Sequence, residues 1–265
     1  MQKLNPNVRL PYKYIKGSVK QRQKLISDLN EVFFDSFQNL VQQKKCRLND
    51  IKDLYIKNLP EPKKINIVKL KNNNTSFGAS DYIYKNEDIV GITLELFLEK
   101  NRISPCVCPV FMHENTHVLY SLVNPKTVIL AQKMNKEFSY DTRYDKLFDE
   151  NLYAVEKLTP SYTKKDMLEK FKEAVLNFLK HKNCYEKINF LQDTRYLLEE
   201  EAFAYSEEVK YARKLKDMGY DISIDNLCNF NYIYYFKEKA EVLKELAFEI
   251  ISKKRKQIAL QNKKM

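Results

Sequence analysis

The stretch FMHENTHVLYSLV, residues 111–123, holds two of the three histidines of the chain within an otherwise mostly apolar run. His113 and His117 are four residues apart, and Glu114 directly follows the first of them. In a helix, which turns about 100° per residue, side chains four positions apart project about 40° from one another. Both imidazoles would therefore lie on one helical face, with Glu114 beside them near its open side.

This pattern has the spacing of a zinc site. Two imidazoles one helical turn apart supply neutral nitrogen ligands to a single ion, and an adjacent glutamate can accept a proton from the zinc-bound water. The five-residue pattern is expected by chance about 0.003 times in a chain of this composition. The alternative is an ordinary core helix, in which both histidines would need buried hydrogen-bond partners. We therefore interpret His113 and His117 as metal ligands.

A catalytic zinc needs a third protein ligand and one open coordination position. The remaining histidine, His181, lies between two lysines at the end of a predicted helix, which is typical of a solvated C-terminus. A carboxylate is the better candidate for the third ligand, because a glutamate that faces an apolar core needs a cation or hydrogen-bond donors.

Three consecutive glutamates lie in the segment RYLLEEEAFAYSEEVKYA, residues 195–212. On a helical wheel, Glu201 falls within the apolar arc, Glu199 lies at its margin, and Glu200 lies on the opposite side. Glu201 is therefore the preferred ligand, and Glu199 is its rival. The alternative role for Glu201 is a salt bridge with lysine at the rim of the core.

The spacing of apolar residues predicts the remaining elements. Spacings of three and four predict helices over residues 18–44, 48–59, 161–180, 185–218 and 234–258. Short apolar runs and a spacing of two predict a strand over residues 65–70 and a hairpin formed by residues 81–85 and 89–96. We expect a single α+β domain over residues 1–265, mainly helical, with a small antiparallel or mixed sheet before the histidine helix.

The formal charge of +11 would by itself favour nucleic acid as a partner, but the excess of basic residues lies at the two ends. Seven basic residues precede the first acidic residue, Asp28, and six follow the last, Glu249, so the interior holds 33 basic against 35 acidic residues. Nucleic acid is therefore not expected as the main partner. Simple solvation explains the basic ends better than contact with phosphate or anionic lipid.

The five cysteines are scattered and odd in number, which indicates free thiols rather than a disulfide framework. Cys106 and Cys108 lack the two-residue gap of common zinc and redox motifs, so we interpret them as buried structural thiols. No apolar run reaches the roughly 20 residues of a membrane span, and no signal-peptide pattern is present. We expect a soluble protein of the cytoplasm, or an effector exported by a signal-less route.

The order of these features resembles the gluzincin group of zinc metallopeptidases. The resemblance consists of a strand, a hairpin, the His-Glu-x-x-His helix and a later helix with the pattern Glu-x-x-Ala-x-x-x-Glu, here Glu201, Ala204 and Glu208. It covers residues 64–212, and its most specific part is the five-residue motif. It implies a zincin-like core, whereas the helix expected over residues 161–180 and both basic ends have no counterpart in that group.

The resemblance implies a set of roles for the site residues. Zinc would be held by His113, His117 and Glu201, and Glu114 would act as the general base. The implied activity is the zinc-dependent hydrolysis of peptide bonds in a protein substrate. The identity of that substrate does not follow from the sequence.

The resemblance also implies where substrate binds. The hairpin strand near Asp81 to Tyr84 would be an edge to which an extended protein or peptide segment adds as a further strand, so recognition would read backbone more than side chains. Tyr120 and Tyr205, each one turn after an expected ligand, are candidates for stabilising the oxyanion or supporting the ligands.

A second class of function stays open. In this alternative the chain is a non-catalytic, zinc-stabilised binding module whose basic ends contact nucleic acid or an anionic membrane. The nearly neutral interior counts against it. Metal content, together with the effect of removing the Glu114 carboxylate, distinguishes the two classes.

Overall fold

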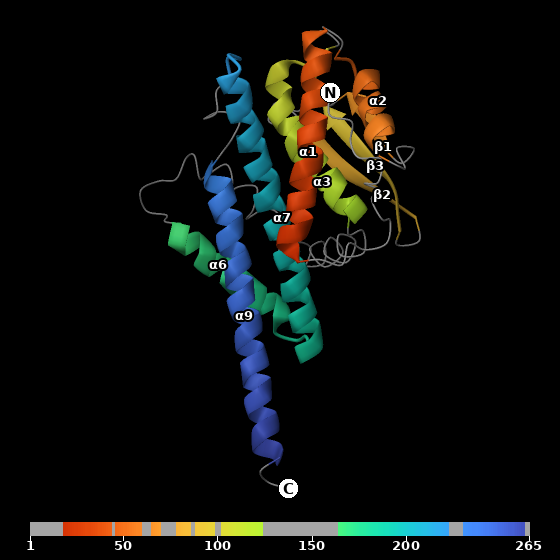
Figure 1. The fold of residues 1–265 in the computed structure, drawn as a ribbon. Helices are drawn as coiled ribbons and strands as arrows, with labels where there is room; N and C mark the ends of the chain where they lie inside the picture. The colour runs from red at the N-terminus through yellow and green to blue at the C-terminus, as the bar shows by residue number, and fades with distance from the viewer. Residues whose placement is uncertain are drawn as a thin grey trace. The chain divides into compact units, whose positions relative to one another are not determined.

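The computed structural model describes residues 18–43, 46–59, 65–69, 78–85, 88–98, 102–123, 164–222 and 230–262 (Figure 1). The chain divides into two compact units, one formed by residues 1–126 with 203–233 and the other by residues 127–202 with 234–265. The boundary falls within one continuous helix, α7 (Cys184–Asp217), so the C-terminal half of α7 belongs to the first unit. The described residues form six α-helices and a three-stranded sheet, which confirms the α+β class.

The first unit contains the sheet and the histidine helix. Its described elements are α1 (Val19–Gln42), α2 (Leu48–Asn58), β1 (Ile65–Lys69), β2 (Gly78–Lys85), β3 (Asp88–Leu96), the 3₁₀ turn η2 (Pro105–Val107), α3 (Cys108–Val123) and the C-terminal half of α7. Aromatic side chains join the helices: Phe37 of α1 stacks on Phe111 of α3 with ring centroids 5.5 Å apart, and Phe33 of α1 lies 4.8 Å from Tyr55 of α2.

The sheet has the strand order β1-β3-β2. β2 pairs with β3 as the expected antiparallel hairpin, whereas β1 runs parallel to β3. The sheet therefore combines one parallel and one antiparallel pair of strands. It is not the fully antiparallel sheet that was one of the two arrangements expected from the sequence. Ser80 of β2 lies opposite Leu94 of β3 and therefore shares its face of the sheet. Leu94 is buried, and α3 packs against β2 and β3.

α3 is buried along almost its whole surface, with Val110 and Leu122 as the exceptions. A helix that is covered on all sides lies at the centre of its unit. Five consecutive polar side chains, residues 113–117, are therefore buried within it. Each of them needs a partner, since a buried polar group without a hydrogen bond is costly.

The second unit is helical in its described residues. Its elements are α6 (Lys164–Leu179), the N-terminal half of α7 and most of α9 (Phe230–Asn262). Phe178 of α6 packs on Phe190 of α7 with ring centroids 4.7 Å apart. Lys239 of α9 is fully buried, with Nζ 4.1 Å from the centroid of the Tyr235 ring, and burial holds the pKa of this lysine well below its usual range.

The helices predicted from apolar spacing are confirmed as α1, α2, α6, α7 and α9, and the predicted strands as β1, β2 and β3. α9 is longer at both ends than predicted. α7 is followed by Gly219, whose φ of 86° lies in the left-handed region that glycine adopts at helix ends. None of the described helices combines the length and apolarity needed to cross a membrane.

The four cysteines in the described residues are free thiols, and Cys228 lies outside those residues. Cys108 is fully buried, as predicted, and burial raises its pKa well above the usual value. Burial also raises the pKa of Cys46 to about 12. Cys106 is only half-buried, because it lies in the short η2 turn rather than in α3, so its interpretation as a buried thiol is wrong.

Candidate metal centre

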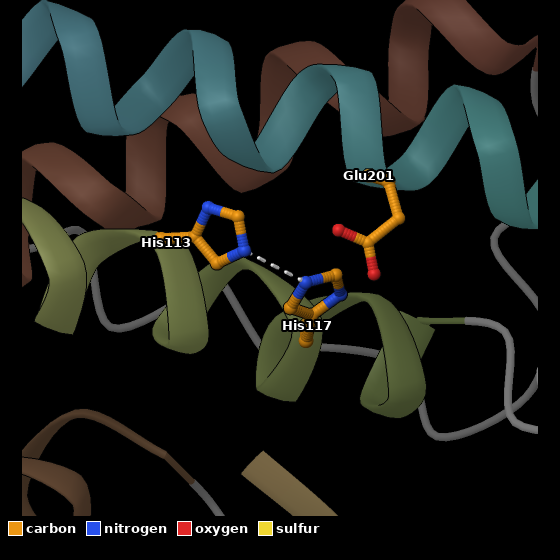
Figure 2. A group of neighbouring side chains, drawn as sticks. All are labelled: His113, His117 and Glu201. Atoms are coloured by element: carbon orange, nitrogen blue, oxygen red, sulfur yellow. Dashed lines mark hydrogen bonds between the residues drawn. The ribbon is translucent and has the colours of Figure 1, made fainter. Parts of the chain in front are cut away.

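His113 and His117 lie one turn apart on α3, and their side chains converge (Figure 2). The Nε2 atoms of the two imidazoles are 3.3 Å apart. Two nitrogens bound to one tetrahedral zinc ion at about 2.0–2.1 Å are themselves about 3.3–3.4 Å apart. The observed separation, which here is that of a hydrogen bond between the two imidazoles, is also the one that two ligands of a single zinc ion would have.

Glu201 of α7 lies beside the two histidines. One ligand atom from each of His113, His117 and Glu201 lies within 4.8 Å of the other two, and the Glu201 carboxylate points towards the imidazoles (Figure 2). The same helix contacts α3 at two further points. The ring of Tyr205 lies 4.4 Å from that of His113, and Glu208 Oε2 lies 3.0 Å from His113 Nδ1. Glu201 precedes Tyr205 by one turn, so these contacts hold its side of α7 towards the histidines.

The three consecutive glutamates of α7 have different environments. Glu199 forms an ion pair with Arg195, whose Nη2 lies 2.7 Å from Glu199 Oε1, whereas Glu201 joins the two histidines. Glu200 is 3% exposed, so the expectation that it lies opposite the buried face is wrong. Glu200 lies on the same side of α7 as Ala204, which follows one turn later and is also buried. Near these residues α7 is therefore buried on a second side, in addition to the side predicted to be apolar.

Glu208 supports the histidine that it contacts. A carboxylate at Nδ1 of a ligand histidine fixes the ring orientation and makes the other nitrogen more basic. Burial disfavours the charged form of the His113 imidazole, but the carboxylates of Glu208 and Glu114 outweigh burial, so the pKa of His113 is raised. Glu208 lies seven residues after Glu201, which puts both side chains on nearly the same face of α7.

Glu114 is held by the edge of the sheet. The Ser80 hydroxyl of β2 donates a hydrogen bond of 2.5 Å to Glu114 Oε2. A hydroxyl donor this close to a carboxylate is typical of a strong, charge-assisted hydrogen bond. The strand predicted to bind substrate and the residue predicted to act as general base are thus in direct contact. Residues 81–84 belong to the same strand.

The other candidate residues lie in separate environments. Tyr120 is buried, with its ring edge-on to Phe203 at 5.9 Å between centroids, whereas Tyr205 is half-buried against His113. His181, the weaker candidate for the third ligand, is exposed in the turn after α6.

The arrangement brings together two imidazole nitrogens, one carboxylate that could complete a metal site, and an adjacent carboxylate, and catalytic zinc sites use this kind of donor set. The contacts of Glu208 and Ser80 were not predicted from the sequence. The seven-residue spacing of Glu208 from Glu201 could have indicated its position, whereas nothing in the sequence marks Ser80. No protein-family model, curated protein sequence or solved structure matches this chain.

Proposed function

We propose that this chain is a zinc-dependent metallopeptidase of the gluzincin type, which hydrolyses peptide bonds of a protein substrate. His113, His117 and Glu201 would hold the ion. The observation that carries the proposal is the 3.3 Å separation of the two Nε2 atoms, which suits two ligands of one tetrahedral ion. Zinc is favoured over magnesium and calcium because imidazole ligands suit zinc, whereas the harder cations take oxygen ligands.

When bound, zinc supplies Lewis acidity, which lowers the pKa of a coordinated water and polarises the substrate carbonyl. Glu114 accepts a proton from the attacking water and returns it to the leaving amine. The hydrogen bond from Ser80 to Oε2 suits this role, because it fixes one carboxylate oxygen and leaves the other able to accept the proton.

Two further residues assist. Glu208 orients His113 through Nδ1, so that Nε2 keeps its lone pair directed towards the ion. Tyr205, whose ring contacts His113, is the candidate hydrogen-bond donor to the oxyanion that forms as the carbonyl is attacked.

The substrate class is an extended segment of a protein. In the described sheet β2 pairs only with β3, so its other edge can accept a further strand through main-chain hydrogen bonds. Ser80 lies on this strand, so a peptide added there would run past the residue that contacts Glu114.

The proposal is tested by the cleavage products of a proteome-derived peptide mixture. The zinc-loaded wild type should generate new peptide termini, and Glu114→Gln, the matched control, should keep its zinc but generate none. If the chain were instead a zinc-stabilised binding module, wild type and Glu114→Gln would give the same absence of products. Wild-type protein without zinc would refute both possibilities.

A further inference from the structure

The two middle residues of the histidine motif, Asn115 and Thr116, are polar and fully buried. Both bond to one side chain of α1, Asn30, which is itself fully buried. Asn115 Nδ2 donates to Asn30 Oδ1 at 2.8 Å, and Asn30 Nδ2 donates to Thr116 Oγ1 at 2.9 Å. The buried carboxamide of Asn30 thus forms hydrogen bonds with two consecutive residues of α3.

The same carboxamide also reaches α7. Asn30 Nδ2 donates to Glu207 Oε2 at 3.0 Å, and Glu207 is buried. Glu207 directly precedes Glu208, whose Oε2 lies 3.0 Å from His113 Nδ1. Asn30 therefore bonds both the helix that carries the histidines and the helix that carries the carboxylates.

The chemistry of asparagine explains its presence on a buried face that, apart from Gln38, is otherwise aromatic and aliphatic. Its neighbours there include Phe33 and Phe37, and a leucine would suit such a face better. A carboxamide, however, offers one acceptor oxygen and two amide hydrogens, and all three partners use them. An aspartate lacks the donors, and a leucine lacks every hydrogen bond.

We propose that Asn30 is a positioning residue for the metal centre, which fixes the rotation and spacing of α3 against α7 through Asn115, Thr116 and Glu207. We call these four residues the Asn30 clamp. The inference rests on the proposed zinc site, because it concerns the same ligands. Ligands that are already held in one geometry bind zinc more tightly, so a looser clamp lowers affinity even when the protein still folds.

The experiment compares Asn30→Leu with Tyr55→Phe. Tyr55 of α2 donates a 2.6 Å hydrogen bond to Asn115 Oδ1, so Tyr55→Phe removes a buried hydrogen bond to the same residue but leaves all three hydrogen bonds of Asn30 in place. Zinc affinity is measured by competition with a chromophoric chelator, and thermal stability is measured separately on metal-free protein.

Asn30→Leu should weaken zinc binding about 10- to 100-fold, whereas Tyr55→Phe should stay within about threefold of wild type although its metal-free form is less stable. Wild-type affinity in Asn30→Leu would overturn the inference. Equal losses of affinity in the two variants would also overturn it, since the effect would then follow from stability alone.

A reciprocal exchange covers the case in which Asn30→Leu does not fold. Asn30→Asp removes the amide donors to both Glu207 and Thr116. Adding Glu207→Gln supplies a donor to the aspartate from the other side while keeping the net charge, and the Thr116 hydroxyl can turn from Met112 O to donate to the aspartate. The single variant should lose zinc affinity and the double variant should recover it to within about threefold of wild type. Failure of the double variant to recover would overturn the inference.

The zinc affinity of the wild type distinguishes a failure of this inference from a failure of the proposed function. Wild-type protein that binds no zinc would overturn both, whereas tight zinc binding by the wild type and by Asn30→Leu alike would overturn the clamp alone.

Discussion

Alanine at Glu201 should weaken zinc binding by about three orders of magnitude. Apparent zinc-binding free energies of zinc-finger peptides at neutral pH are about 10–16 kcal/mol, and on that scale one of three protein ligands accounts for roughly 4 kcal/mol. Each 1.4 kcal/mol changes an affinity about tenfold. Glu201 is the carboxylate whose ligand atom lies within 4.8 Å of those of both histidines, so the full loss should appear at this position.

The two adjacent glutamates provide matched controls on the same turn of α7. Glu199→Ala removes the partly exposed ion pair with Arg195, worth about 0.3–0.5 kcal/mol of stability, and should leave zinc affinity unchanged. Glu200→Ala removes a buried carboxylate and should alter thermal stability without releasing zinc. The assay is a competition titration of all three variants with a chromophoric chelator. Wild-type affinity in Glu201→Ala together with loss of zinc in Glu199→Ala would refute the reasoning.

Three further substitutions test the other roles. His117→Ala should abolish stoichiometric zinc binding, measured by elemental analysis after dialysis, and full occupancy in this variant would contradict the site. Glu114→Gln should keep zinc and thermal stability while hydrolysis falls about 10²- to 10⁴-fold, since an amide cannot accept the proton, and a cleavage rate near wild type would remove Glu114 from its role. Glu208→Ala should weaken zinc binding about 10- to 100-fold in the same chelator titration, and an unchanged affinity would mean that Glu208 does not orient His113.

The parts of the site that depend on local spacing were predictable from the sequence. His113 and His117 converge because residues four apart in a helix are neighbours, whatever the helix packs against. The hairpin of β2 and β3 was predictable for the same reason, since its two strands are adjacent in the chain. The side of α7 that carries Glu201 also followed from the helical wheel.

The contacts between distant segments were not predictable. Ser80 and Glu114 are 34 residues apart, and Asn30 and Glu207 are 177 residues apart, so neither pair shares a local pattern. The error at Glu200 has a related cause. A helical wheel assumes one buried face along the whole helix, but α7 is covered on a second side near its middle.

The central claim is that two imidazoles and one carboxylate of this chain bind zinc, and X-ray absorption at the zinc edge tests it most directly. The zinc-loaded wild type should show nitrogen and oxygen ligands at about 2.0–2.1 Å, with the multiple-scattering pattern of two imidazoles and no sulfur. Zinc added to His117→Ala, which should not hold the ion stoichiometrically, should not give this two-imidazole pattern. A sulfur ligand at about 2.3 Å, or an oxygen shell without imidazole, would contradict the account.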